Sequence, residues 1–221
     1  MKITQKGFAI LENDTHISKW AEESGRLDHD QNMLPLVLKH IKQGDTVLDV
    51  GAYIGDHTIA YSNAVGKHGK VLAFEPNEDA FECLQHNLSE FKNTELFNSC
   101  VGETSGKMVL VKYDDNVGMT YVKPGKGKTK SLTIDSLELE RCDFIKIDVE
   151  GFELKVLEGA EETIKKFRPK MLIEINDFTL HRAGITQNDI YIFLIQHNYS
   201  YKNIFGGSIY DPQFDLICTP N

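Results

Sequence analysis

Cysteines are scarce in the 221-residue sequence, and none is spaced as part of a metal-binding or redox pair. There is no C-x-x-C pair and no histidine at zinc-finger spacing, which argues against structural zinc, so no metal ligands are expected. No apolar run approaches the ~20 residues that a bilayer-spanning helix needs. Charges interrupt the first residues where a secretory signal would be apolar. We therefore expect a cytoplasmic protein with reduced thiols and no membrane partner.

Basic residues are also in short supply, with 24 lysines and arginines against 33 aspartates and glutamates. The net charge of −9 argues against a nucleic-acid partner, which would need clustered positive charge. One basic run, KPGKGKTK at 123–130, is rich in glycine and predicts a solvated, mobile loop, with a substrate-facing role as the alternative. The length and the ordinary composition predict one globular domain.

The sequence does contain a clear alternation of short apolar runs with amphipathic segments. The apolar runs predict strands at 45–51, 70–76, 94–102, 143–151 and 170–176. Helical spacing is found at 55–65, 77–91, 152–167 and 186–198. Strands that alternate with helices of about a dozen residues predict an α/β fold, in which a mostly parallel sheet carries helices on both faces.

Several residues mark where the helices begin and break. Asn77 is a good N-cap, and Thr186 with Asp189 three places later forms a capping-box pattern. Gly159 is expected to interrupt its helical pattern. The segment 106–130 fits no βα unit and predicts an inserted hairpin.

The two ends of the chain differ from this pattern. Segments 199–205 and 214–220 predict two strands joined by a glycine turn, which suggests an antiparallel edge on the sheet. The first residues carry two weaker helical patterns that would cover one end of the sheet. The expected organisation is a helical cover at 1–42 and the main domain at 43–221, within a single globular unit.

The turn after the first strand is a candidate ligand-binding loop. Gly51 and Gly55 lie four apart with Ala52 between them, so the backbone can approach a ligand closely. The spacing differs from the G-x-G-x-x-G fingerprint of dinucleotide sites, and a glycine-rich turn without a ligand is the alternative. Glu75 ends the second strand, where a carboxylate can accept hydrogen bonds from both ribose hydroxyls. Asp49 beside the loop suits a cation and would repel a pyrophosphate, so S-adenosylmethionine fits this description.

Four stretches together resemble the FkbM family of class I methyltransferases over about residues 44–177. They are VLDVGAYIGDHT at 47–58, AFEPN at 73–77, SLTIDSL at 131–137 and FIKIDVEGFELKVLEGA at 144–160. The resemblance implies a Rossmann-like, doubly wound, seven-stranded sheet with a reversed last strand. It also implies S-adenosylmethionine as cofactor and methylation of a hydroxyl on a sugar, a glycan or a natural-product-like small molecule.

The resemblance also implies a set of cofactor-binding residues. Asp49, Gly51, Ala52 and Gly55 would line the methionine part, and Glu75 would bind the ribose. Asn98 and Ser99, which end the third expected strand, fall where the adenine is held. An aspartate is frequent there in related methyltransferases, so these two positions depart from the pattern. The expected set is completed by Tyr53, Pro76 and Asp148.

Polar residues alternate along the apolar strand 143–151. Lys146, Asp148 and Glu150 are spaced two apart, so they point to one face. At the carboxyl end of a central strand, Asp148 would face the cleft, and a carboxylate there can take the proton of an acceptor hydroxyl. Glu150 and His57 are the other catalytic candidates; a helix-capping role is the alternative for each. A buried Lys146 needs an acidic partner, for which Asp135 is the first choice.

The leading interpretation is an O-methyltransferase that acts on a small molecule or glycan. The alternatives are a methyltransferase acting on protein or nucleic acid, and a nucleoside-binding domain without turnover. A nicotinamide oxidoreductase fits less well because of the glycine spacing. The sequence leaves the acceptor, the oligomeric state and any metal requirement open, since a fold does not determine a substrate.

Overall fold

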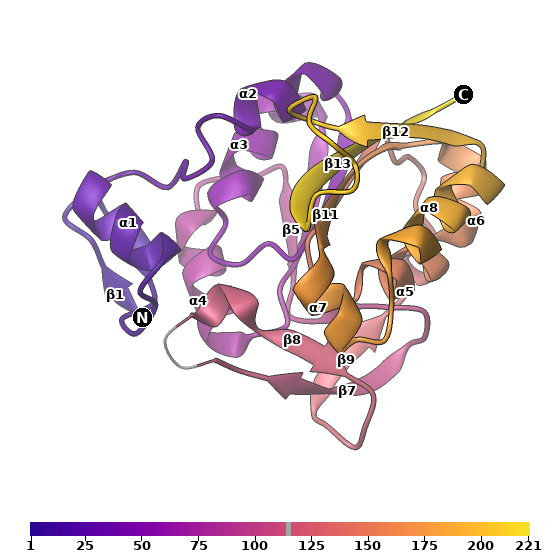
Figure 1. The fold of residues 1–221 in the computed structure, drawn as a ribbon. Coiled ribbons are helices and arrows are strands. Elements are labelled where there is room, and N and C mark those ends of the chain that lie inside the picture. The colour runs from indigo at the N-terminus through magenta and orange to yellow at the C-terminus, as the bar shows by residue number, and fades with distance from the viewer. Residues whose placement is uncertain (114–115) are drawn as a thin grey trace.

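Short apolar strands form a seven-stranded sheet at the centre of the computed structural model, which describes residues 1–113 and 116–221 (Figure 1). The two remaining residues fall within the insertion expected at 106–130. The strand order is β12-β13-β11-β10-β3-β4-β5. The strands are β3 (Thr46–Val50), β4 (Lys70–Phe74), β5 (Thr94–Phe97), β10 (Phe144–Ile147), β11 (Lys170–Asn176), β12 (Tyr199–Asn203) and β13 (Gln213–Pro220).

The direction of the strands confirms the Rossmann-like class. β3, β4, β5, β10 and β11 pair in parallel, and only β13 among the described strands of this sheet runs against its neighbours. The predicted antiparallel edge, made by the C-terminal hairpin, is confirmed. The reversed strand β13 lies between β11 and β12 and pairs antiparallel with both. β12 is therefore the edge strand.

Helices cover both faces of this sheet, as predicted. The helices are α3 (Asp56–Val65), α4 (Glu78–Asn87), α5 (Glu153–Glu158), α6 (Glu161–Phe167), α7 (Asp177–Arg182) and α8 (Gln187–Gln196), with single turns η2 (Gly66–His68) and η4 (Asp135–Leu137). Successive strand residues point to opposite faces. Val47 packs with Tyr61 and Val65 of α3, whereas Leu48 lies in a core cluster with Leu157 of α5 and Leu194 of α8. Figure 1 shows the two groups of helices on either side of the sheet.

The helix ends confirm the predicted caps. The Asn77 side chain accepts a hydrogen bond from the backbone N–H of Asp79 at the start of α4. Thr186 and Asp189 form the capping box of α8. The long helical pattern breaks at Gly159, which follows α5, and resumes as α6.

The third expected strand, 94–102, was predicted too long. The chain leaves the main sheet after β5 and forms β6 (Cys100–Val101), which pairs with β9 (Thr129–Leu132) in a second, four-stranded sheet. β7 (Gly106–Val111) and β8 (Tyr121–Lys123), joined through η3 (Val117–Met119), form the expected hairpin. The basic run 123–130 is not one loop, because it begins in β8 and ends in β9, although its lysines are exposed.

Of the first 42 residues, those up to Leu27 pack with α4 and the glycine loop, whereas Met33 to Ile41 pack with α3 and the sheet. Together they form a hairpin that was not predicted, β1 (Lys2–Ile3) with β2 (Ala9–Ile10), then α1 (Ile17–Ser24), α2 (Leu34–Val37) and η1 (Leu38–His40). Asn87 of α4 holds the hairpin: it accepts from the Ala9 N–H at 2.7 Å and donates to the carbonyls of Ala9 and Ile54. The division at residues 42 and 43 stays a prediction. No helix within the described ranges is long and apolar enough to cross a membrane.

Candidate active site

A cavity of about 630 Å³ opens at the carboxyl ends of β3, β4, β10 and β11. This is the end of an open parallel sheet where ligands bind. The N-terminal segment, the glycine loop and the segment around η3 close its sides. Eight of the predicted site residues line it: Gly51, Tyr53, His57, Glu75, Pro76, Ser99, Asp148 and Glu150.

The glycine loop passes directly against the strand that carries Asp148. Gly51 has φ +87°, and a Cβ added there would lie 1.8 Å from the backbone oxygen of Asp148. The Asp148 N–H donates to the Val50 carbonyl at 3.1 Å, and the N–H groups of Gly51 and Ala52 both donate to the Phe74 carbonyl. Glycine is therefore required here so that the loop can lie against β10.

Glu75 faces the cavity from the end of β4 and also holds the loop. Its Oε2 accepts from the Tyr53 N–H at 2.9 Å, and its Oε1 accepts from the Asn77 N–H at 2.7 Å. Burial raises the pKa of Glu75 to about 7, although these two hydrogen bonds oppose the shift. A carboxylate oxygen has two acceptor positions, so both oxygens can still accept from hydroxyl groups.

Four predicted residues do not line the cavity but support its walls. Asp49 is fully buried and accepts from the Thr58 hydroxyl at 2.6 Å. Asn98 donates through its side chain to the Glu75 carbonyl at 3.0 Å. Ala52 packs in a core cluster, and Gly55 with φ +95° precedes α3.

Ser99 lines the cavity and carries a buried hydroxyl. The residue is only 1% exposed, and its Oγ has no hydrogen-bond partner among the described residues. A buried polar atom without a partner is costly, so this hydroxyl suits a ligand that supplies one.

Lys146 joins the glycine loop to the strand of Asp148. Its Nζ donates to the Gly51 carbonyl at 2.8 Å, lies 3.1 Å from Asp148 Oδ2, and is 3.8 Å from Asp49 Oδ1. Burial lowers the pKa of Lys146, yet the carboxylates of Asp148 and Asp49 raise it above its ordinary value overall. The prediction that Asp135 pairs with this lysine was wrong. Asp135 instead accepts from the backbone at the start of α6, including Thr163 N–H at 2.8 Å.

His57 is buried at the start of α3 and faces the N-terminal segment. Its Nε2 lies 2.9 Å from Asp30 Oδ2 and 3.9 Å from Asp56 Oδ2. Burial lowers the pKa of His57, but Asp56 and the hydrogen bond with Asp30 raise it above its ordinary value overall. Sequence reasoning missed Asp30, because it lies in an irregular segment with no motif around it.

Glu150 does not cap the following helix, so that alternative was wrong. Glu153 supplies the backbone contacts there, accepting from the N–H groups of Val149 at 3.2 Å and Gly151 at 3.0 Å. Glu150 has φ +58° and its Oε2 is buried without a partner in the described part of the chain. Burial, followed by the charge of Asp148, raises the pKa of Glu150 to about 8.

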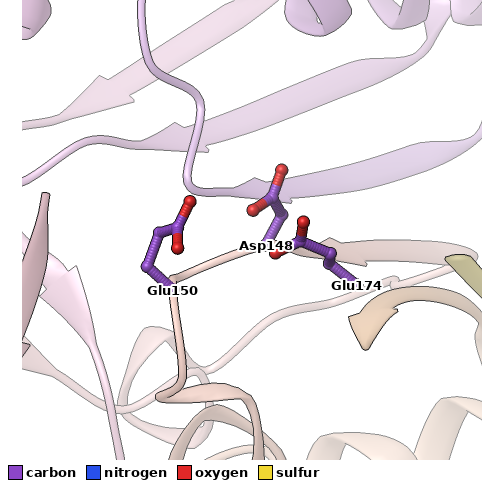
Figure 2. A group of neighbouring side chains, drawn as sticks. All are labelled: Asp148, Glu150 and Glu174. Carbon is purple, nitrogen blue, oxygen red and sulfur yellow. The ribbon is translucent and has the colours of Figure 1, made fainter. Parts of the chain in front are cut away.

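Glu174 of β11 completes a group of three carboxylates that sequence reasoning missed. Asp148, Glu150 and Glu174 each place an oxygen within 4.8 Å of the others, and Figure 2 shows the three side chains close together. Burial and the charges of Asp148 and Glu150 raise the pKa of Glu174 well above its ordinary value. The sequence feature that could have identified Glu174 is its place as a charged residue inside the apolar run KMLIEIN.

The cavity carries a strong excess of acidic side chains over basic ones. Lys146 is the one lysine in its described lining. The acids are Asp14, Asp30, Asp56, Glu75, Asp148, Glu150, Glu174 and Asp215. Such a site favours a ligand with positive charge, and its carboxylates can accept protons or hydroxyl hydrogen bonds.

The comparisons with known proteins all lead to methyltransferases. Residues 49–201 match the model of the methyltransferase FkbM domain. The hexuronic acid methyltransferase AglP of Haloferax volcanii is 27% identical over 168 residues, which cover 73% of this chain and 66% of that protein. A demethylmenaquinone methyltransferase of Shouchella clausii is 27% identical over 128 residues, covering 58% of this chain and 51% of that protein. The chain thus spans less than two thirds of the length of either relative.

Two solved structures share the fold. The methyltransferase FkbM from Methylobacillus flagellatus superposes with a TM-score of 0.55 at 20% identity, covering 79% of this chain and 43% of that one. The fibrillarin of Aeropyrum pernix, solved with natively bound S-adenosyl-L-methionine, gives a TM-score of 0.53 at 14% identity, covering 87% of this chain and 76% of that one. At these identities the likeness concerns the fold alone.

Proposed function

Because this chain belongs to the methyltransferase FkbM family, we propose that it transfers a methyl group from S-adenosylmethionine to a hydroxyl of a sugar, glycan or similar small molecule. The observation that carries the proposal is the acid-lined cavity at the carboxyl ends of β3, β4 and β10, where Glu75 and Asp148 face one space. A relative named for its action on a hexuronic acid supports a sugar as the acceptor.

The residues at the loop side of the cavity fit S-adenosylmethionine. When bound, this cofactor supplies a methyl group on a positively charged sulfonium, and it carries an ammonium and a ribose. Glu75 would accept the ribose hydroxyls, since each of its oxygens keeps an acceptor position. Ser99 would offer its unsatisfied hydroxyl to the adenine. The excess of acids around the cavity complements the positive charges.

Asp148 is the residue that would act on the acceptor. Lys146 holds its Oδ2 at 3.1 Å, so the carboxylate is kept in one orientation. A carboxylate there can accept the hydrogen bond of the acceptor hydroxyl, direct its oxygen at the methyl group and take the proton. Orientation and proton transfer of this kind contribute about 10²–10⁴-fold to a rate.

The proposal is tested by methyl transfer from isotope-labelled S-adenosylmethionine to a panel of neutral sugars, hexuronic acids, phenols and short peptides. We expect saturable transfer to a sugar, with a product that survives mild base, because a methyl ether resists the hydrolysis that cleaves a methyl ester. Asp148→Asn is the matched control for background labelling. Transfer to peptides alone would favour the protein-directed alternative, and cofactor binding without transfer would favour a nucleoside-binding domain.

A further inference from the structure

The three carboxylates in Figure 2 come from two neighbouring strands or the residues directly after them, and all three residues line the cavity. Asp148 and Glu150 follow β10, and Glu174 lies near the end of β11. Each offers an oxygen within 4.8 Å of the other two. A divalent cation with metal–oxygen bonds of about 2.0–2.6 Å holds its ligand oxygens roughly 3–5 Å apart. The spacing therefore suits one cation.

The protein itself does not satisfy these oxygens. Glu150 Oε2 and Glu174 Oε2 are both shielded from solvent, and neither has a hydrogen-bond partner within the described ranges. Glu174 Oε1 has only a long contact of 3.4 Å with the Gln213 amide. Arg182 is close, but its guanidinium donates to the backbone oxygen of Glu150 and not to the carboxylate. Two residues of the cavity lining thus each carry a buried acceptor oxygen that no described group binds.

The local charge is also unbalanced. Lys146 supplies one positive charge through Asp148 Oδ2, and it shares that charge with Asp49. Asp215 adds a further acid on the same side of the cavity, and burial raises its pKa to about 6. Even with the nearby Arg182 guanidinium, two cations cannot neutralise this many carboxylates, so either protons or a bound cation must complete the charge balance.

We propose that Asp148, Glu150 and Glu174 form a binding site for a divalent cation such as Mg²⁺ or Mn²⁺. Hard cations of this class prefer carboxylate oxygens, and three protein ligands leave positions open for water or a substrate oxygen. The inference extends the proposed function, because a cation in this place would polarise the acceptor hydroxyl and make its proton easier to remove. It replaces the expectation of a protein without metal ligands.

The test is calorimetric titration of MnCl₂ into the full-length protein after treatment with a chelator, without cofactor or acceptor. Wild type should bind one equivalent. Glu174→Gln and Glu150→Gln keep the shape of the side chain and remove one charged ligand, so the affinity should fall at least tenfold, since even outer-shell changes lower metal affinity by about 10–100-fold. Glu90→Gln, at an exposed position outside the cavity, is the matched control and should bind like wild type.

Two results would overturn the site. One is the absence of saturable heat when MnCl₂ or MgCl₂ is titrated. Protons shared among the carboxylates would then balance their charge. The other is equal affinity in wild type, Glu174→Gln and Glu150→Gln. Because the titration needs neither cofactor nor acceptor, its failure is distinct from failure of the methyltransferase proposal. A protein that binds S-adenosylmethionine but no Mn²⁺ contradicts this inference alone.

Discussion

Replacing Lys146 by methionine should cost this protein far more stability than replacing a surface lysine. The side chain is buried and lies between Asp148 at 3.1 Å and Asp49 at 3.8 Å, with a hydrogen bond to the Gly51 carbonyl. Methionine fills the space but leaves Asp49 as a buried carboxylate whose remaining partner is the Thr58 hydroxyl. Breaking a buried pair in this way costs about 3–5 kcal/mol.

The assay is urea denaturation and thermal unfolding of Lys146→Met and wild type, both monitored by circular dichroism. For a chain of this size each kcal/mol shifts the melting temperature by about 2–4 °C, so a fall of roughly 6–20 °C is expected. Lys70→Met is the matched control, because the Lys70–Glu95 pair also links two strands but both side chains are about half exposed. Such a pair contributes about 0–1 kcal/mol.

A second variant identifies the cause of the loss. Adding Asp49→Asn to Lys146→Met removes the unpaired charge, while the amide oxygen can still accept from Thr58. The double variant should recover part of the lost unfolding free energy, and the two substitutions should show an interaction energy of about 0.5–3 kcal/mol. The reasoning is refuted if Lys146→Met costs no more than Lys70→Met, since the lysine would then not be a buried ion-pair partner.

Two further predictions concern the acceptor side and the N-terminal segment. Asp148→Asn should lower single-turnover methyl transfer by about 10²–10⁴-fold while the dissociation constant of the cofactor changes much less, and an unchanged rate would make His57 the leading catalytic candidate. The pKa of His57 is raised in the fold, so its contribution to stability is complete below the unfolded pKa of 6.5 and is lost as pH rises through the folded pKa. The pKa of Asp30 is lowered, mainly by its hydrogen bond with His57, so its contribution is complete above the unfolded pKa of 3.8 and is lost as pH falls through the folded pKa. The stability lost in Asp30→Asn, measured by urea unfolding across the pH range, should therefore be largest between about pH 4 and 6.5; a loss that does not vary with pH contradicts the ion pair.

Local sequence signals were sufficient for most of the fold. Alternating apolar runs and helical spacing predicted the parallel sheet, and the side-chain chemistry of Asn77 and Thr186 predicted two helix starts. Each of these signals depends on residues within a few positions of one another. The early end of β5 at Phe97 was missed because the following apolar pair, Cys100–Val101, reads like more of the same strand although it joins another sheet.

The parts of the site that were missed depend on strand register and on distant segments. Lys146 lies opposite Asp49 in the parallel pairing of β10 with β3, and that register selects its partners over Asp135. Glu174 joins the carboxylate group only because β11 lies next to β10. Asp30 reaches His57 from 27 residues away through an irregular segment. No local pattern encodes these contacts.

The central claim is that the cavity binds S-adenosylmethionine with Glu75 on its ribose. The most direct measurement is calorimetric titration of S-adenosylmethionine into wild type, Glu75→Ala and the exposed neighbour Glu78→Ala, with melting temperatures to establish that each variant is folded. We predict one equivalent bound by wild type and by Glu78→Ala. Glu75→Ala should lose about 2–3 kcal/mol of binding free energy, or roughly 30–150-fold in affinity, because charge-assisted hydrogen bonds are removed. No binding by wild type, or equal affinity in a folded Glu75→Ala, would contradict the account.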